Sequence, residues 1–284
     1  MALAINTNMT SINAQRHLQK STNALGKTFE RLSSGLRINR AADDAAGMSI
    51  STRMTAQVRG TTQAIRNSND AISAVQVADG ALEETVNALQ RIRELAVQGA
   101  NDTLIAGDRE DLQNEITQLV YEIQRIATET EFNNQKMVDG TFATKKFQVG
   151  PDGGQTIAVT VNAASAKALM GATSANFKLY SGGATTAIKM QSMANSLIKR
   201  CDSALDSISD IRSSLGSYQN RFEAVIANLS SMVENTSAAR SRILDADIAT
   251  ETANLTRNAI LQQAGTAILA QANQQPQIAL QLLG

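Results

Sequence analysis

Hydrophobic positions recur at spacings of three and four residues over most of the chain, which is typical of helices that pack against one another. The longest run, from about Ala45 to Gln98, contains no proline, and Asp43 or Asp44 can cap its first turn. Helices of this length are far above the globular average and indicate a coiled coil or a bundle. The clearest seam of this run holds Val75, Ala78, Leu82, Leu89, Ile92 and Ala96.

Heptad-like runs also occur on both sides of this helix. We expect a helix from about Ile5 to Ser33, closed by Gly35, and another from about Met190 to Thr236. A further helix is expected to be capped by Asp108. Short connections between such helices favour antiparallel neighbours. The seam of the Asp108 helix comprises Leu112, Ile116, Leu119, Ile123 and Ile126.

The periodicity changes in the middle of the chain. Residues Lys146 to Val161 read KFQVGPDGGQTIAVTV, which predicts two strands around a PDGG turn. The stretch Asn162 to Lys189 is rich in Ala, Ser, Thr and Gly, with one strand candidate at Asn176 to Tyr180. We expect this stretch to be a loop-rich β patch.

Both ends of the chain are amphipathic and carry no charge at their tips. No charged side chain occurs in Met1 to Gln15 or after Arg257, where Asn and Gln supply the polarity. Such ends can pair with each other as helices and leave amide and aliphatic surface for other copies of the chain. The alternative for the last segment is a Gln-rich disordered tail. The seam residues are Leu18, Leu25, Phe29, Leu32 and Leu36 at one end, and Leu261, Ala264, Ile268, Ile278 and Leu282 at the other.

The composition excludes several classes of protein. Hydrophobic residues make up 43% of the 284 residues but aromatics only 3%, which is low for a compact enzyme-like core. The formal net charge is zero, which argues against nucleic acid as a partner. No apolar stretch is long enough to span a membrane, and the N-terminus lacks the order of a Sec signal, so secretion would need another route.

Few residues offer site chemistry. His17 is the single histidine and Cys201 the single cysteine, so neither a disulfide nor a His/Cys metal site is expected, and no cofactor is expected. Cys201 keeps heptad register, which favours a buried small hydrophobe over a reactive thiol. The adjacent carboxylates Glu83 and Glu84 favour a solvated helix face, and GPDGG favours a turn over a phosphate loop.

Five segments of the sequence resemble bacterial flagellin in the family's order. They begin with INTNMTSINAQRHLQKSTNALGKTFERLSSGLRINRAADDAAGMSIS and end with SRILDADIATETANLTRNAILQQAGTAILAQANQQPQIALQLLG. Between them lie RIRELAVQGAND, EFNNQKMVDG and KFQVGPDGGQT. The resemblance covers about Met1 to Val161 and Met190 to Gly284. The chain departs from the family in its short middle and in Cys201, because most flagellins lack cysteine.

This resemblance implies a mainly α fold, a long-helix coiled-coil bundle with paired N- and C-terminal helices and a small β-hairpin region in the middle. Residues 1–43 and 241–284 would form the inner tube of a filament. Residues 44–161 and 190–240 would form the outer tube, and 162–189 a short variable insertion. The implied function is a structural, self-assembling filament subunit for swimming motility, not an enzyme.

The resemblance also implies partners and a location outside the cell. In the family, the subunit leaves through the flagellar type III export apparatus, and a chaperone holds its C-terminal region. Hook-associated junction proteins flank the filament, and a cap protein promotes insertion at its tip. The mature protein would then be part of the extracellular flagellum, with no nucleic acid partner and no membrane insertion.

A vertebrate partner, Toll-like receptor 5, is implied by the stretch LQRIRELAVQGAN, Leu89 to Asn101. Arg91 and Leu95 are four residues apart on one helix face and off the seam, so we expect both to point outward. The family packs this same face between subunits. The implied contact residues are Leu89, Arg91, Leu95, Gln98 and Glu115.

Two other functions stay open from the sequence. A hook–filament junction protein shares the terminal pattern, although the complete C-terminal signature favours flagellin. An intracellular coiled-coil adaptor would share the long helices, but the uncharged tips argue against it. An enzyme is a more distant alternative.

Overall fold

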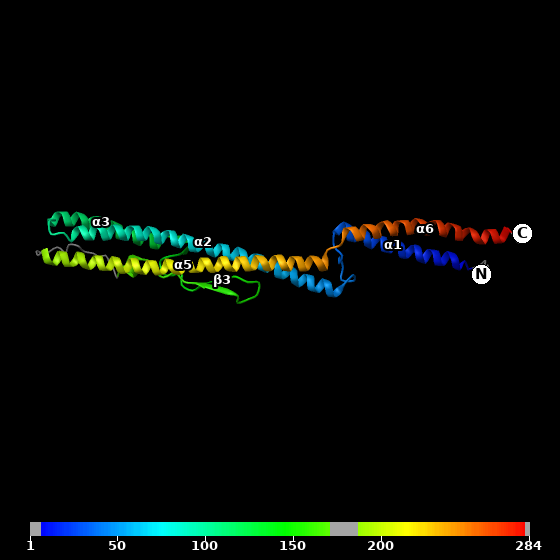
Figure 1. Cartoon of the computed structure of the whole chain (residues 1–284), viewed down its shortest axis with the longest axis horizontal. Helices are drawn as coiled ribbons and strands as arrows, with labels where there is room; N and C mark the ends of the chain where they lie inside the picture. Colours follow the sequence, from blue (N-terminus) through cyan, green and yellow to red (C-terminus); the bar gives the residue numbers. More distant parts are fainter. Residues whose placement is uncertain (1–6, 171–186, 282–284) are drawn as a thin grey trace. The chain divides into compact units, whose positions relative to one another are not determined.

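The computed structural model describes residues 7–170 and 187–281, with side chains described to residue 170 and again over 191–274. Contacts divide the chain into two compact units (Figure 1). Met1–Val58 and Glu234–Gly284 make up the terminal unit, and Arg59–Val233 makes up the central unit. The secondary structure of the described residues consists of six helices and two small hairpins. This confirms the predicted mainly α fold with a β-hairpin region in the middle of the chain.

In the terminal unit, helices α1 (Met9–Ser34) and α6 (Ile248–Gln281) lie side by side and antiparallel (Figure 1). The side chain of Asn8 accepts a hydrogen bond from the backbone N–H of Ser11 at 3.1 Å and so caps α1. The predicted start at Ile5 lies outside the described residues. The predicted stop is confirmed, because Gly35 has a φ of +70°, a left-handed conformation that glycine adopts at little cost.

The segment that follows α1 pairs with the segment that precedes α6. Leu36 and Asp245 form an antiparallel bridge, flanked by backbone hydrogen bonds from Arg37 to Leu244 at 2.6 Å and from Ala246 to Gly35 at 2.9 Å. Asp44 accepts the N–H of Gly47 at 2.9 Å, which confirms it as the cap of α2 (Ala45–Gly99).

The helix that was predicted to end at about Thr236 continues to Leu244. Helix α5 (Ala187–Leu244) ends and α6 begins only at Ile248. The carboxylate of Asp247 accepts the N–H groups of Ala249 at 3.0 Å and Thr250 at 3.4 Å, so it caps a new helix.

The central unit packs α2 and α5 against each other with α3 (Ala106–Glu129) beside them. Ion pairs Arg93–Asp202 and Arg212–Asp79, each at 2.7 Å, show that α2 and α5 are antiparallel. Side chains from all three helices are fully buried in its core, which confirms the predicted seam of α2 and, of the predicted α3 seam, Ile116 and Ile123. The fully buried side chains include Val75, Leu82, Leu89, Ile116, Ile123, Ile208, Leu215 and Phe222.

The predicted hairpin is present as β3 (Lys145–Gln148) and β4 (Thr156–Val159), paired so that Gln148 lies opposite Thr156. A second hairpin, β1 (Glu131–Phe132) and β2 (Gln135–Lys136), was not expected from the sequence. Its two turn residues are Asn133 and Asn134, with φ of 48° and 60°. Asparagine tolerates this conformation and suits a two-residue hairpin turn.

The expected loop-rich β patch is wrong where it is described. Residues Ala166–Met170 form a short helix, α4, whose Ala166, Leu169 and Met170 are buried in the core of the central unit. Helix α4 packs against α3. The strand candidate at Asn176 to Tyr180 lies outside the described residues.

Candidate interaction surfaces

The interface between α1 and α6 follows a seven-residue repeat of small, polar and aliphatic side chains. Leu18, Leu25 and Leu32 of α1 are half-buried on it, as the sequence predicted. The seam of α6 was predicted one position off. Phe29, placed on the seam of α1 by the sequence, is instead 65% exposed. The α6 residues that are buried or half-buried at this repeat are Glu251, Leu255, Asn258, Gln262, Gly265, Leu269 and Ala272.

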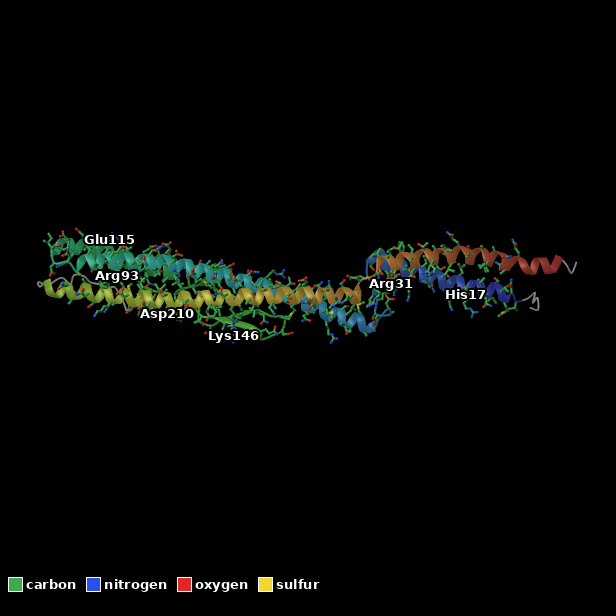
Figure 2. All side chains as sticks on the ribbon, viewed as in Figure 1. His17, Arg31, Arg93, Glu115, Lys146 and Asp210 are labelled. Carbon is green, nitrogen blue, oxygen red and sulfur yellow. The ribbon has the colours of Figure 1, made fainter. Side chains whose placement is uncertain are left out.

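Polar contacts join α1 and α6 at several positions along their length. Near the chain ends, the Asn8 amide donates to the carbonyl of Ala272 at 2.7 Å, and the Ser11 hydroxyl donates to the side chain of Asn273 at 2.8 Å. Further in, Arg31 of α1 (labelled in Figure 2) forms an ion pair with Glu251 of α6 at 3.2 Å. The pair was not predicted from the sequence, because Arg31 lies beside the α1 seam and Glu251 occupies a position of α6 where an apolar side chain would be usual.

The outward face of α6 carries an apolar row. Leu261 and Ile268, predicted as seam residues, are 49% and 57% exposed, and Ala264 between them is also exposed. Ile260 beside them is 59% exposed. The side chains of Ile278 and Leu282 lie outside the described set. The row Ile260, Leu261, Ala264 and Ile268, which we call the outer row, is therefore largely open to solvent in the single chain.

A charged face lies where α2 meets α3. The Arg91 guanidinium binds Glu115 of α3 at 2.9 Å and Glu94 at 3.1 Å, with Glu115 labelled in Figure 2. The hydrogen bond to Glu115 is the main cause that raises the pKa of Arg91. Arg91, Glu115 and Gln98 are all exposed, as expected for contact residues.

The expectation that Leu95 points outward is wrong. Leu95 is 1% exposed and belongs to the core, and Leu89 is 0% exposed. Helix α2 packs against both α3 and α5, so its buried face is wider than the single seam from which the prediction was made. Of the five predicted contact residues, the structure therefore leaves Arg91, Gln98 and Glu115 accessible and places Leu89 and Leu95 beneath them.

A buried arginine holds the α2–α3 turn. Arg109, 3% exposed, donates to the carbonyl of Gly99 at 3.2 Å and to that of Asn101 at 2.9 Å. These carbonyls lie at and just beyond the end of α2, where the helix has no further N–H donors of its own. No signal in the heptad pattern marks this residue, because charged side chains at the start of a helix are usually solvated.

Cys201 is 0% exposed on α5, which confirms the predicted core position. Burial raises the pKa of its thiol to about 11, so the thiol stays protonated at neutral pH.

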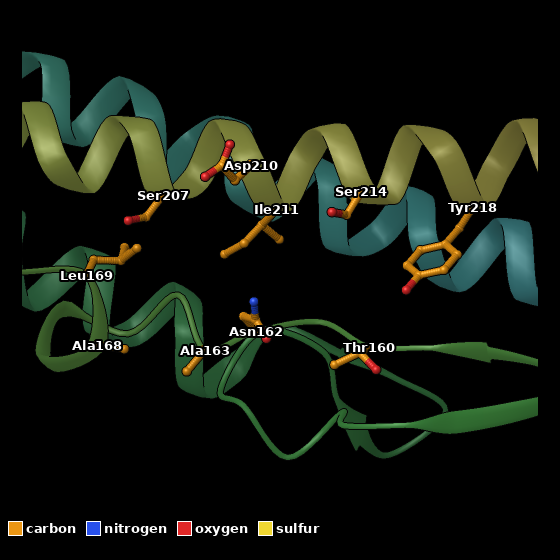
Figure 3. Close-up of a pocket in the computed structure, with 10 residues that line it drawn as sticks. All are labelled: Thr160, Asn162, Ala163, Ala168, Leu169, Ser207, Asp210, Ile211, Ser214 and Tyr218. Atoms are coloured by element: carbon orange, nitrogen blue, oxygen red, sulfur yellow. The ribbon is translucent and has the colours of Figure 1, made fainter.

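A hollow of about 450 Å³ lies between α5 and the segment from Thr160 to Leu169 (Figure 3). Ile211 of α5 and Leu169 of the opposite segment line it with apolar side chains, and Asp210 is the one charged side chain among the described residues that line it. It therefore offers no paired acid and base.

Membrane spans and metal sites were also considered for the described residues. Over residues 7–170 and 187–281, none of the helices combines the length and hydropathy that crossing a membrane requires. Within the same ranges, His, Cys, Asp and Glu side chains do not gather in threes as a metal site would need.

Long paired helices with an open apolar row define a helical structural protein. Comparison with known families makes this specific. The N-terminal helical region of bacterial flagellin matches residues 5–143, and the C-terminal helical region of bacterial flagellin matches residues 198–283. The chain therefore belongs to the bacterial flagellin family, whose members are structural subunits that self-polymerise in the flagellar filament.

Two flagellins are similar to this chain over nearly its full length. A flagellin of Halalkalibacterium halodurans is 47% identical over 99% of this chain and 100% of its own. A flagellin of Bacillus subtilis is 42% identical over the same shares. A solved structure from Vibrio parahaemolyticus, provisionally named a flagellar hook-associated protein, has a TM-score of 0.59 at 13% identity. It covers 72% of this chain and 100% of its own, and it shows the fold alone.

Proposed function

We propose that this subunit builds the filament by burying the outer row of α6 against neighbouring copies. In this proposal, residues 1–43 and 241–284 line the inner tube. Residues 44–161 and 190–240 form the outer tube, and residues 162–189 form the insertion. The observation that carries the proposal is that Leu261 and Ile268 stay 49% and 57% exposed on a helix that has no charged side chain after Arg257.

The size of the effect fits assembly. Full burial of a leucine or isoleucine side chain stabilises by about 1.5–3 kcal/mol, so the exposed half of each supplies roughly 1 kcal/mol on association. One such contact is weak, but every subunit of a polymer presents the same row to its neighbours. Isolated amphipathic helices are marginal in water, so we also expect the terminal helices of the free subunit to be mobile.

Deletion of Gln262 to Gly284 tests the proposal. We expect the truncated protein to lose polymerisation while the central unit still folds, which electron microscopy and circular dichroism can measure together. Filaments of normal length from the truncated protein would refute it.

A point variant sharpens the test. Leu261→Ser with Ile268→Ser should raise the concentration needed for assembly. The matched control, Gln263→Ser with Thr266→Ser, changes exposed polar residues of the same helix and should assemble as the unchanged protein does.

The remaining partners follow the same proposal. The chain would be exported through the flagellar type III apparatus, with a chaperone on its C-terminal region, into the extracellular filament. Hook-associated junction proteins and a cap protein would bound that filament. The uncharged, amide-rich composition of both ends supports this.

A hook–filament junction protein is the second candidate, favoured by the shared fold with the Vibrio parahaemolyticus structure. The purified protein decides between the two: long filaments seen by electron microscopy support a filament subunit, and failure to polymerise supports a junction protein.

We further infer that Toll-like receptor 5 binds the face formed by Arg91, Gln98 and Glu115. Arg91 supports this, because its planar guanidinium is exposed and already oriented by two carboxylates, and arginine is favoured at the centres of interfaces. Leu89 and Leu95 would act indirectly by holding α2 in place. The same face would pack between subunits, so activation should need depolymerised protein.

Receptor-expressing cells treated with monomer test this inference. Arg91→Ala should weaken both signalling and filament stability. Arg66→Ala, a matched exposed arginine on the same helix, should change neither. A monomer that fails to activate such cells at any concentration would end the receptor assignment and leave the packing role in place.

A further inference from the structure

We propose that the Arg31–Glu251 ion pair and a notch at Gly265 set the register in which α1 pairs with α6. The register determines the position of the outer row along α1. It therefore also determines where neighbouring copies would contact the outer row. The consequence for assembly rests on the proposed role of the outer row, whereas the register itself concerns only α1 and α6 of the same chain.

The apolar part of the interface cannot select one register by itself. Leu18, Leu25 and Leu32 recur every seven residues on α1, as Leu255, Gln262 and Leu269 do on α6. A shift of seven residues, about 10 Å along the helix, returns each set to equivalent seam positions. The other seam residues are small or polar, so a shifted pairing would lose little apolar contact.

The ion pair does not repeat in this way. Glu251 is 7% exposed, and it is the one buried carboxylate among the described residues. Its carboxyl oxygen lies 3.2 Å from the Arg31 guanidinium, whose side chain is 32% exposed. In a shift of seven residues, Glu251 would stand near the level of Leu25 or Ile38, away from Arg31. A buried carboxylate without its partner is strongly unfavourable, so shifted registers are selected against.

The notch acts in the same direction. A Cβ added at Gly265 would lie 3.3 Å from the Leu18 Cδ1 atom, closer than ordinary contact, so the helices approach there because the glycine has no side chain. In a shift of seven, Leu18 would meet Asn258 or Ala272, and both residues carry a Cβ.

The backbone pairing between the segments next to α1 and α6 also favours the observed register, but it does not fix the register alone. A shift would break the backbone hydrogen bonds from Arg37 to Leu244 and from Ala246 to Gly35. The segment between α1 and α2 is nevertheless long enough, since an extended chain gains about 3.3 Å per residue, to follow a 10 Å displacement. The register therefore depends on the side chains that pair across the interface.

Charge reversal tests the proposal in filaments of the full-length chain. Arg31→Glu and Glu251→Arg should each raise the concentration needed for assembly by roughly tenfold or more, because each leaves like charges facing across a partly buried site. The double variant should restore assembly. Glu251→Gln, which keeps an acceptor for Arg31, should stay close to the unchanged protein. Arg16→Glu, an exposed charge on α1, is the control and should have no comparable effect.

The register is read directly by spin labels on Gln15→Cys and Gln271→Cys, both exposed positions, with labelled chains diluted into unlabelled wild-type filaments. Cys201 is buried and stays unlabelled. The single reversals should broaden or shift the distance by up to about 10 Å, and the double variant should return it.

The outcomes separate the two proposals. An unchanged distance in both single variants, or a double variant that fails to recover, would overturn the register assignment. Normal assembly of the Leu261→Ser, Ile268→Ser variant would instead overturn the role of the outer row and leave the register result standing.

Discussion

Replacement of Leu95 by alanine separates a core role from direct recognition. Leu95 is 1% exposed and lies among Leu89, Ile92 and Ile123 in the core of the central unit, whereas Arg91 on the same helix is exposed. Leu95→Ala should lower the free energy of unfolding by about 2–5 kcal/mol, since it removes buried methyl groups and leaves a cavity. Arg91→Ala removes surface ion pairs and should change the free energy of unfolding little.

Urea unfolding of the monomer, followed by circular dichroism, measures these values. The Leu95→Ala transition should move to lower urea with an unchanged slope, because the surface exposed on unfolding stays nearly the same. The matched control Leu95→Met keeps the volume and should cost less than about 1.5 kcal/mol. In the receptor assay, Arg91→Ala should lose signalling while it stays fully folded, and Leu95→Met should keep signalling.

Two results would refute this reasoning. A Leu95→Ala variant as stable as the unchanged protein would contradict burial. Loss of signalling in a stable Leu95→Met variant would show that the receptor contacts the leucine itself.

Three further predictions follow from single residues. Cys201→Ser should cost about 1 kcal/mol or more because it places a hydroxyl in an apolar seam, and rapid labelling of the native thiol would contradict its burial. Gly35→Ala should destabilise the terminal unit by about 1 kcal/mol, measured by thermal unfolding of the assembled filament, because alanine is strained at this positive φ. Hydrogen bonds from Thr250 lower the pKa of Asp247 from 3.8, so its stabilising contribution is present above that pH and lost as the pH falls, and an NMR titration should find this low pKa.

The long helices and their core could be predicted from periodicity. Val75, Leu82 and Leu89 recur at seven-residue spacing, and all three are buried in the core of the central unit. The β3–β4 hairpin was predictable because PDGG separates two alternating segments. The Asn133–Asn134 turn was missed because its flanking strands are only two residues each, too short to show alternation.

The candidate surfaces were less predictable, because a seam assigned to one helix does not say how many neighbours that helix has. Leu95 lies off the seam of α2 yet is buried, since α3 and α5 cover two sides of the helix. On α6, leucine and isoleucine suggested a seam through Leu261 and Ile268. The face that meets α1 instead holds Glu251, Gln262 and Gly265, whose roles depend on partners across the interface.

A helical reconstruction of the assembled filament tests the central claim most directly. We expect α1 and α6 to pair in the register that places Arg31 beside Glu251, with Leu261 and Ile268 covered by neighbouring copies. A filament in which those two side chains face solvent, or in which α6 pairs with a neighbour's α1 in another register, would contradict it.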